Sequence, residues 1–465
     1  MSLRQQVMRG GAFLLVRDSL GLGISLGGIL LLTRLLGPTN YGLYAGPIAI
    51  VLFLTVIGRI GVDVFLVRRE EDPEPRMYDQ AFTMLLIAGL VLAAITFLTL
   101  PLLRLWYRES GFVPPLEALL LVVPVSLMTL PAIARLERDL NYRAVALLEL
   151  SGQIVYTSVA LTLAWQGFGV WAPVTAYWCS QTWLLVRSCM ISGYQPRLHL
   201  SRPMFKEIMS YSLGFSISQW VWTSRLLVNP LVIGRYLGPD AVAYVSLAIK
   251  FADLLGFVKT ATWRLSIAAL SKVQHDYNRL RNAMEEAMGL QILASGPVFA
   301  GFALIAPYMV PLLFGSGWDT GLKIYPFVAL SYLANAVFSM QISVLYVLKH
   351  NWNVAAFHFI HIVLFAGAAL ILVSQMGLFG YALAEAIALV GYLYLHVKMT
   401  KIFRYSYASA VPWLIAFVPP LFSVYLPLPW KLTLWIPMLL VLAVRPQQRR
   451  QIKEYSGYVL AWRSA

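Results

Sequence analysis

Long apolar stretches alternate with short polar breaks along the chain, from near Ala12 to Val444. A helix needs about 20 mainly apolar residues to cross the ~30 Å hydrocarbon core of a bilayer. Fourteen stretches approach this length, so the pattern predicts an all-α polytopic membrane protein with about 14 transmembrane helices. The predicted spans are 12–36, 41–67, 79–103, 113–134, 145–165, 168–190, 211–237, 240–263, 284–312, 322–348, 354–376, 378–398, 408–427 and 431–445.

An internal repeat organises these spans. The stretch "TRLLGPTNYGLYAG" begins at Thr33, and "GRYLGPDAVAYVSLA" begins at Gly234, so their Leu-Gly-Pro turns lie 201 residues apart. In each copy a helix ends near a basic residue, Gly and Pro break it, and a tyrosine-bearing helix follows. The turn residues are Arg34, Gly37, Pro38, Arg235, Gly238 and Pro239. An even number of spans separates the copies, which indicates a parallel repeat of two pseudo-symmetric six-helix lobes, as in secondary transporters.

The repeat divides the chain into five predicted parts. Residues 1–190 form an N-terminal lobe with spans 1–6, and residues 211–404 form a C-terminal lobe with spans 7–12. A basic inter-lobe linker, 191–210, is expected to lie on the cytoplasmic surface as an amphipathic segment. Spans 13 and 14 occupy 405–445, outside the repeat, and a basic cytoplasmic tail follows at 446–465.

Composition agrees with a membrane protein, and the charge distribution predicts its orientation. Hydrophobic residues make up 59% of the chain and charged residues 12%, about half the charged share of an average soluble domain. A net charge of +15 could suggest a nucleic-acid partner. However, the basic residues gather in alternate breaks, which the positive-inside rule explains with both termini cytoplasmic. Anionic inner-leaflet lipids would balance this charge, so we expect membrane lipids as partners and no nucleic acid.

Five basic residues remain inside or near the ends of the predicted spans, where a charge at the bilayer centre costs roughly 2.5–3.5 kcal/mol. Helical rise places Arg225 and Lys250 near the midplane and Arg59 nearer the inner side. Lys259 and Arg264 can reach the cytoplasmic interface with their long side chains. The three deeper cations are therefore candidates for contact with an anionic substrate.

Acidic neighbours leave two interpretations open. Asp63 follows Arg59 by four residues and Asp253 follows Lys250 by three, so each pair could share one helix face and neutralise itself. Arg225 has no carboxylate on its own predicted helix, so another helix, water or a ligand must meet its charge.

Polar and aromatic residues near these cations suit a sugar. Gln219 and Asn229 are predicted to contact substrate hydroxyl groups, together with Asn335. Trp220 and Trp222 could stack on sugar rings, or they could pack in the core or face lipid.

A second set of residues is a candidate for gating or ion coupling: Arg17, Asp18, Asp63, Asp253 and Glu385. Arg17 and Asp18 could equally be interfacial charges. Glu385 has no basic neighbour in its span, so it is protonated, hydrogen-bonded to another helix, or a coupling site. His358 and His361 lack a third ligand at a helical spacing, and no P-loop is present. We therefore expect no metal and no cofactor.

Several of these stretches resemble a known family. "LLTRLLGPTNYGLYA" and the following "IGRIGVDVFLVRRE" resemble the N-terminal signature of the polysaccharide transporter (Wzx-like) flippases, members of the multidrug/oligosaccharidyl-lipid/polysaccharide (MOP) exporter superfamily. "RYLGPDAVAYVSLAIKFADLL" resembles that family's seventh and eighth helices. The likeness is clear over about 20–70 and 205–275.

The resemblance implies a function as well as a fold of two six-helix lobes plus two C-terminal helices. The implied activity is translocation of undecaprenyl-pyrophosphate-linked oligosaccharide units from the inner to the outer leaflet of the bacterial cytoplasmic membrane by alternating access. Such units feed cell-surface polysaccharide synthesis, so the resemblance also implies a polysaccharide polymerase and chain-length machinery as partners.

Two other classes of function compete. A multidrug/cation antiporter of the same superfamily would use buried carboxylates for cationic drugs and coupling ions. An enzyme would need a sizeable outward loop with catalytic groups, but the largest outward break, "RLWYRESGFVPP", is about a dozen residues long. The surplus of basic residues in the spans favours the flippase, because a pyrophosphate is an anion that Arg and Lys can bind with charge-assisted hydrogen bonds.

Overall fold

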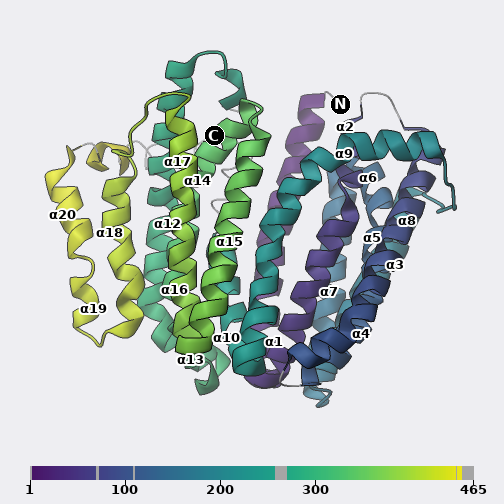
Figure 1. The fold of residues 1–465 in the computed structure, drawn as a ribbon, viewed down its shortest axis with the longest axis horizontal. Coiled ribbons are helices and arrows are strands. Elements are labelled where there is room, and N and C mark those ends of the chain that lie inside the picture. The colour runs from purple at the N-terminus through teal and green to yellow at the C-terminus, as the bar shows by residue number, and fades with distance from the viewer. Residues whose placement is uncertain (1–2, 70–72, 108–109, 257–269, 447, 453–465) are drawn as a thin grey trace. The chain divides into compact units, whose positions relative to one another are not determined.

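The computed structural model describes residues 3–69, 73–107, 110–256, 270–446 and 448–452, with side chains from residue 20 onward except at 22, 110, 211, 213–215 and 316. The chain forms two compact units, Met1–Ser246 (unit 1) and Leu247–Ala465 (unit 2). All regular structure in the described ranges is helical, which confirms the all-α prediction (Figure 1). The unit boundary falls within α10, whereas the repeat places it at the linker, so the lobe limits stay a prediction.

The helices of unit 1 follow one another through short connections. They are α1 (Leu3–Arg59), α2 (Val62–Arg68), α3 (Pro75–Trp106), α4 (Val113–Leu120), α5 (Val122–Met128), α6 (Leu130–Arg138), α7 (Tyr142–Trp165), α8 (Trp171–Ser192), α9 (Arg202–Thr223), the 3₁₀ turn η2 (Ser224–Leu227), the π-helical turn η3 (Asn229–Ile233) and α10 (Gly234–Leu255).

Unit 2 contains the end of α10 and the helices that follow it. They are α12 (Tyr277–Phe314), α13 (Asp319–Leu322), α14 (Tyr325–Val347), α15 (Asn351–Met376), α16 (Leu378–Ala388), α17 (Tyr392–Thr400), α18 (Val411–Leu421), η6 (Phe422–Tyr425), α19 (Trp430–Thr433) and α20 (Ile436–Val444). In this unit α12 packs against both α14 and α18, α15 packs against α16, and α18 packs against α20.

Each predicted span falls on helical structure wherever the chain is described. By length and apolar composition, eight helical segments among the described residues could cross a membrane, and two shorter apolar segments, Val411–Tyr425 and Trp430–Val444, follow them. The chain is thus a multi-pass membrane protein, while the exact number of 14 crossings stays a prediction.

The two repeated Leu-Gly-Pro turns have the same backbone conformation. Gly37 has φ 70° and ψ 173°, and Gly238 has φ 79° and ψ −173°. Only glycine adopts this region readily, because a Cβ atom would clash with the backbone there. Proline then starts the next helical segment, where its fixed φ is suitable and its missing N–H costs nothing. The shared conformation gives the physical reason for the sequence repeat.

The two turns also lie against each other within unit 1. A Cβ atom on Gly42, which follows the first turn, would lie 1.8 Å from the carbonyl oxygen of Pro239 in the second turn. The absence of a side chain at Gly42 therefore permits a backbone-to-backbone contact that no other residue allows.

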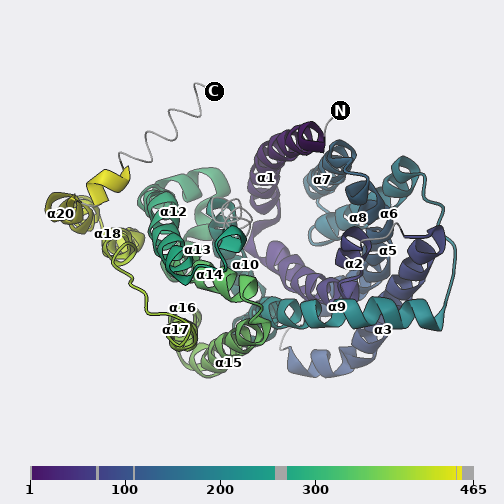
Figure 2. The same ribbon diagram turned by 90° about the horizontal axis from the view of Figure 1, so that it is seen from above.

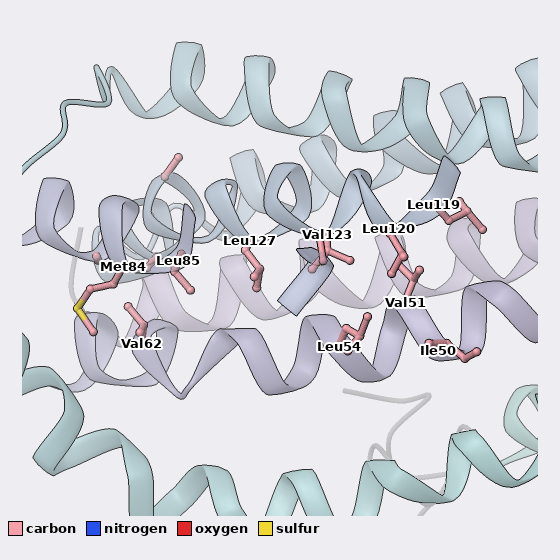
Figure 3. Packing of buried hydrophobic residues seen from close by; sticks show 14 of the residues in the cluster. Ile50, Val51, Leu54, Val62, Met84, Leu85, Leu119, Leu120, Val123 and Leu127 are labelled. Atoms are coloured by element: carbon pink, nitrogen blue, oxygen red, sulfur yellow. The ribbon is translucent and has the colours of Figure 1, made fainter. Parts of the chain in front are cut away.

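Apolar side chains of unit 1 meet in one core between α1, α2, α3, α4 and α5. Figure 3 shows Val51 and Leu54 of α1 pointing toward Leu120, Val123 and Leu127 of α4 and α5. Seen along the helices, α7 lies beside both α1 and α8 (Figure 2). The long helices are held by close packing of this kind, since lipid tails supply no hydrophobic drive for association between them.

The predicted inter-lobe linker, 191–210, is non-helical only between Gly193 and Ser201. α8 ends at Ser192, Gly193 follows in the left-handed conformation (φ 63°), and α9 begins at Arg202. From there α9 contacts α2 at one end of unit 1 (Figure 1).

Side chains on the first turns of α3 hold this extended segment. The backbone N–H of Arg197 donates to Asp79 Oδ1 at 3.2 Å, and that of Ser201 donates to Gln80 Oε1 at 2.6 Å. The Tyr194 hydroxyl also donates to Asp79 Oδ1 at 2.9 Å. Burial and the Asp79 carboxylate raise the pKa of Tyr194, so its phenol stays protonated and remains a donor.

Candidate functional site

Arg59 lies at a break between two helices of unit 1. α1 ends at Arg59, and α2 begins only after Ile60 (φ 49°) and Gly61 (φ 71°), both left-handed. A β-branched residue in this region is strained by roughly 1–3 kcal/mol, which surrounding contacts must offset. Here the Ser212 hydroxyl of α9 donates to the Gly61 carbonyl at 3.2 Å. The chain thus bends directly after Arg59.

The break bears on the two interpretations that the sequence left open for Arg59 and Asp63. Spacing of i, i+4 brings side chains together only on a continuous helix, and these two residues lie on different helices. No ion pair joins them in the described part of the chain. The exposed Arg59 side chain instead lies within electrostatic range of the Tyr177 phenol on α8.

Hydroxyl and amide groups gather in the same interior of unit 1. The Tyr177 phenol lies close to Ser126, whose hydroxyl donates to Gln181 Oε1 at 3.0 Å. The Tyr156 hydroxyl donates to that of Tyr44 at 3.1 Å. The sequence did not single out these residues, because an uncharged serine or tyrosine within an apolar span does not stand out as a buried charge does.

Arg225 lies on a distorted segment between α9 and α10. The 3₁₀ turn η2 carries Arg225, and the π-helical turn η3 around Pro230 follows. The Arg225 guanidinium lies 5.2 Å from the Trp222 ring centroid, a cation–π geometry. η2 packs against α1, so the turn that carries Arg225 lies beside α1 within unit 1.

Lys250 and Asp253 lie at the start of unit 2, on α10. The i, i+3 ion pair that the spacing allows is not formed between these two described residues, and Asp253 instead accepts a hydrogen bond from the Tyr332 hydroxyl of α14. Lys250 is half-buried and has no ion pair or hydrogen bond among the described residues. Its charge is therefore not neutralised in the way that the spacing suggests.

The predicted sugar-binding residues differ in their surroundings. Gln219 is exposed on α9. Asn229 is 6% exposed, and its amide donates to the Val242 carbonyl at 3.2 Å and the Ser246 hydroxyl at 2.8 Å. These bonds favour a structural role for Asn229, although substrate contact through its remaining oxygen stays a prediction. Asn335 likewise donates to the Tyr392 hydroxyl at 2.9 Å.

Glu385 is fully buried in unit 2. The Tyr381 hydroxyl, one turn earlier on α16, donates to its Oε1 at 3.1 Å. His358 and His361 are buried beside the Phe357 ring. Among the described residues, no three His, Cys, Asp or Glu side chains gather as a metal site would require. A coupling role for Glu385 stays a prediction.

Some predicted residues fall outside the described side chains. Lys259 and Arg264 lie in 257–269, and the side chains of Arg17 and Asp18 precede residue 20. Of the two basic turn residues, Arg235 donates to the Leu105 and Trp106 carbonyls at the end of α3 and lies 5.0 Å from the Trp106 ring centroid. Arg34 is exposed.

Comparison with known proteins agrees with this architecture. Residues 31–323 match the family described as polysaccharide biosynthesis protein. The chain is 26% identical over 304 residues to the succinoglycan biosynthesis transport protein ExoT of Rhizobium meliloti, covering 65% of this chain and 61% of that protein. It is 20% identical over 327 residues to the lipopolysaccharide biosynthesis protein WzxC of Escherichia coli, covering 69% and 65%. The match thus spans a little less than two thirds of each relative.

Solved structures share the fold at low sequence identity. The lipid II flippase MurJ in its inward closed conformation superimposes with a TM-score of 0.75 at 13% identity, over 92% of this chain and 96% of that one. An inward-facing multidrug resistance MATE family transporter of the MOP superfamily gives 0.67 at 16% identity, over 84% and 98%. The family match extends over more than half of the chain, so this multi-pass membrane protein belongs to the polysaccharide biosynthesis protein family and has the MOP-superfamily fold.

Proposed function

We propose that this protein is a flippase that moves undecaprenyl-pyrophosphate-linked oligosaccharide units from the inner to the outer leaflet of the bacterial cytoplasmic membrane. Both termini would be cytoplasmic, and alternating access would move the headgroup. The supporting relatives are named as transport and biosynthesis proteins for succinoglycan and lipopolysaccharide. The observation that carries the proposal is the presence of two cations, Arg59 and Lys250, in predicted spans without an ion pair among the described residues.

Electrostatics connects these cations with the substrate. A basic side chain in a span costs several kcal/mol unless it faces a wet cavity or a partner. A pyrophosphate brings about two negative charges, which cannot enter a region of low dielectric constant unpaired. Charge-assisted hydrogen bonds from arginine and lysine would offset both costs. The basic side chains would thereby neutralise the pyrophosphate, and the pyrophosphate would neutralise the basic side chains.

Other side chains would complete the contact. Arg225, held against the Trp222 ring, offers guanidinium N–H donors that match phosphate oxygens. Gln219 is exposed on the same helical stretch and could bond to sugar hydroxyls. The polymerase and chain-length machinery would then take the unit on the outer face.

A multidrug/cation antiporter is the second candidate. The fully buried Glu385 favours it, because a buried carboxylate is a possible proton or cation site. A coupling residue of this kind is also compatible with a flippase driven by an ion gradient, so Glu385 alone does not decide between the two functions.

Transport in proteoliposomes separates the candidates. Purified protein would be reconstituted with a fluorescent prenyl-pyrophosphoryl glycan, and the fraction accessible to an external quencher would be followed over time. We expect protein-dependent flipping of the glycolipid and no accumulation of a cationic dye under a proton gradient. Dye transport without glycolipid flipping would establish the antiporter instead.

A further inference from the structure

A groove of about 480 Å³ lies between α7 and α8 in unit 1, apart from the candidate transport residues. It is lined by the first turns of α7, up to Ser151, and by the last turns of α8, from Trp183 to Ile191. The residues that matter are Arg143, Leu147, Trp183, Arg187 and Ile191. The positive-inside pattern predicts that this end of both helices lies at the inner leaflet.

Close packing of α7 against α8 closes one end of the groove and fixes its shape. A Cβ on Gly152 of α7 would lie 2.7 Å from Leu184 of α8, and the Ser180 hydroxyl donates to the Gly152 carbonyl at 3.0 Å. The Trp183 indole N–H donates to the Ser151 hydroxyl at 2.9 Å. The groove therefore ends, near Ser151 and Trp183, where the two helices meet.

The charge of the groove is of one sign. Arg143 and Arg187 both line it, and no acidic residue does. The Arg187 guanidinium lies 5.6 Å from the Trp183 ring centroid, and it has no ion pair or hydrogen bond in the described part of the chain. The Asn141 amide oxygen, by contrast, is already used by the Ala144 N–H at 3.2 Å. The Arg187 guanidinium therefore offers donors to an anion, and Arg143 adds a second positive charge to the groove.

Below the arginines the wall is apolar and open. Leu147 is 56% exposed and Trp183 40% exposed. Arg143 and Ser151 are eight residues apart on α7, which spans ~12 Å along a helix. That length accommodates the upper part of an acyl chain beneath a headgroup at the arginines.

We propose that this groove is a binding site for an anionic phospholipid of the inner leaflet. The phosphate lies between Arg143 and Arg187, and an acyl chain lies along Leu147 and Trp183. Two cations at the membrane surface contribute about 1 kcal/mol each toward an anionic lipid. The apolar wall distinguishes a lipid from a soluble phosphate, which would leave it uncovered. The proposal does not depend on what the protein transports.

Native mass spectrometry of the detergent-solubilised full chain tests the proposal. Dioleoyl phosphatidylglycerol and dioleoyl phosphatidylcholine would be titrated separately, because their acyl chains are the same and only the headgroup charge differs. The wild type should bind the anionic lipid about 30-fold more tightly, the ratio that two such cations give. An Arg143→Gln/Arg187→Gln variant should lose this preference.

Three controls make the result decisive. Arg68→Gln/Arg76→Gln removes two exposed arginines near the same end of unit 1 and should keep the preference. Arg143→Lys/Arg187→Lys should keep it in part, because the charge remains. Glycerol 3-phosphate should not compete. If the glutamine variant at the groove keeps the full preference, if the lysine variant binds no better than the glutamine variant, or if glycerol phosphate displaces the lipid, the proposal is wrong.

Discussion

Replacing Gly42 with alanine should disrupt the contact between the two repeated turns. The new Cβ would lie 1.8 Å from the Pro239 carbonyl oxygen and 2.5 Å from its carbonyl carbon. Ordinary contact begins at 3.4 Å, so the two backbones would have to move apart by about 1.6 Å. Both clashing groups are backbone, and therefore no side-chain rotation can relieve the overlap.

The magnitude follows from two opposing terms. Overpacking in a close contact costs about 1–3 kcal/mol, and a backbone clash lies at the upper end. Alanine regains up to about 1 kcal/mol of helix propensity over glycine. The net loss is thus about 2 kcal/mol, which lowers an unfolding midpoint by about 4–8 °C in a domain of 150–250 residues.

Thermal unfolding of the detergent-solubilised protein, followed by fluorescence of its 14 tryptophans, measures this change. Gly27→Ala on the same helix is the matched control, because a Cβ there meets nothing within 4 Å. Only the propensity gain remains at Gly27, so that variant should unfold at or above the wild-type temperature. If Gly42→Ala is as stable as Gly27→Ala, the turns do not touch as described.

Four further substitutions test three separate parts of the structure. Gly37→Ala and Gly238→Ala should each cost about 1–3 kcal/mol in the same unfolding assay, because both backbones occupy a glycine-only region; equal stability with wild type would contradict the shared turn conformation. Asp79→Ala removes the acceptor of two bonds from the linker, so limited trypsin digestion after Arg197 should become faster, and unchanged digestion would show that the clamp does not hold the linker. Arg138→Gln should cost about 1.5–3 kcal/mol, since the guanidinium donates to the Leu66 and Arg69 carbonyls at 3.1 and 2.8 Å; an unaltered midpoint would refute that contribution.

Local backbone chemistry explains which parts of the fold could be predicted from the sequence. Span length and apolar composition predict helices, and the Gly37-Pro38 and Gly238-Pro239 steps predict breaks, because each signal acts through the residues that carry it. The repeat was visible for the same reason, since one strained backbone conformation requires the same residue in both copies.

The remaining features depend on contacts between residues far apart in sequence. Nothing local indicates that Ile60 is left-handed, because Ser212 of α9 supports the break from outside. Pairing of Arg59 with Asp63, one of the two interpretations that the sequence left open, requires a continuous helix, and the helix breaks between them. Lys250 is not paired with Asp253, whose carboxylate accepts a hydrogen bond from a tyrosine on α14. Rules of helical spacing cannot anticipate a competitor from another helix.

The central claim is that cations inside the spans bind an anionic passenger. The most direct test is the initial rate of flipping of a fluorescent prenyl-pyrophosphoryl glycan in proteoliposomes containing Arg59→Gln/Lys250→Gln, with Arg59→Lys/Lys250→Arg and Arg34→Gln as controls. Loss of a charged hydrogen bond costs about 1.5–3 kcal/mol, so the rate should fall at least tenfold in the neutral variant. The Arg59→Lys/Lys250→Arg variant should stay within about threefold of the wild-type rate, because both charges remain. Arg34→Gln should do the same, because Arg34 is not one of the proposed substrate contacts. An unchanged rate in the folded neutral variant would contradict the account.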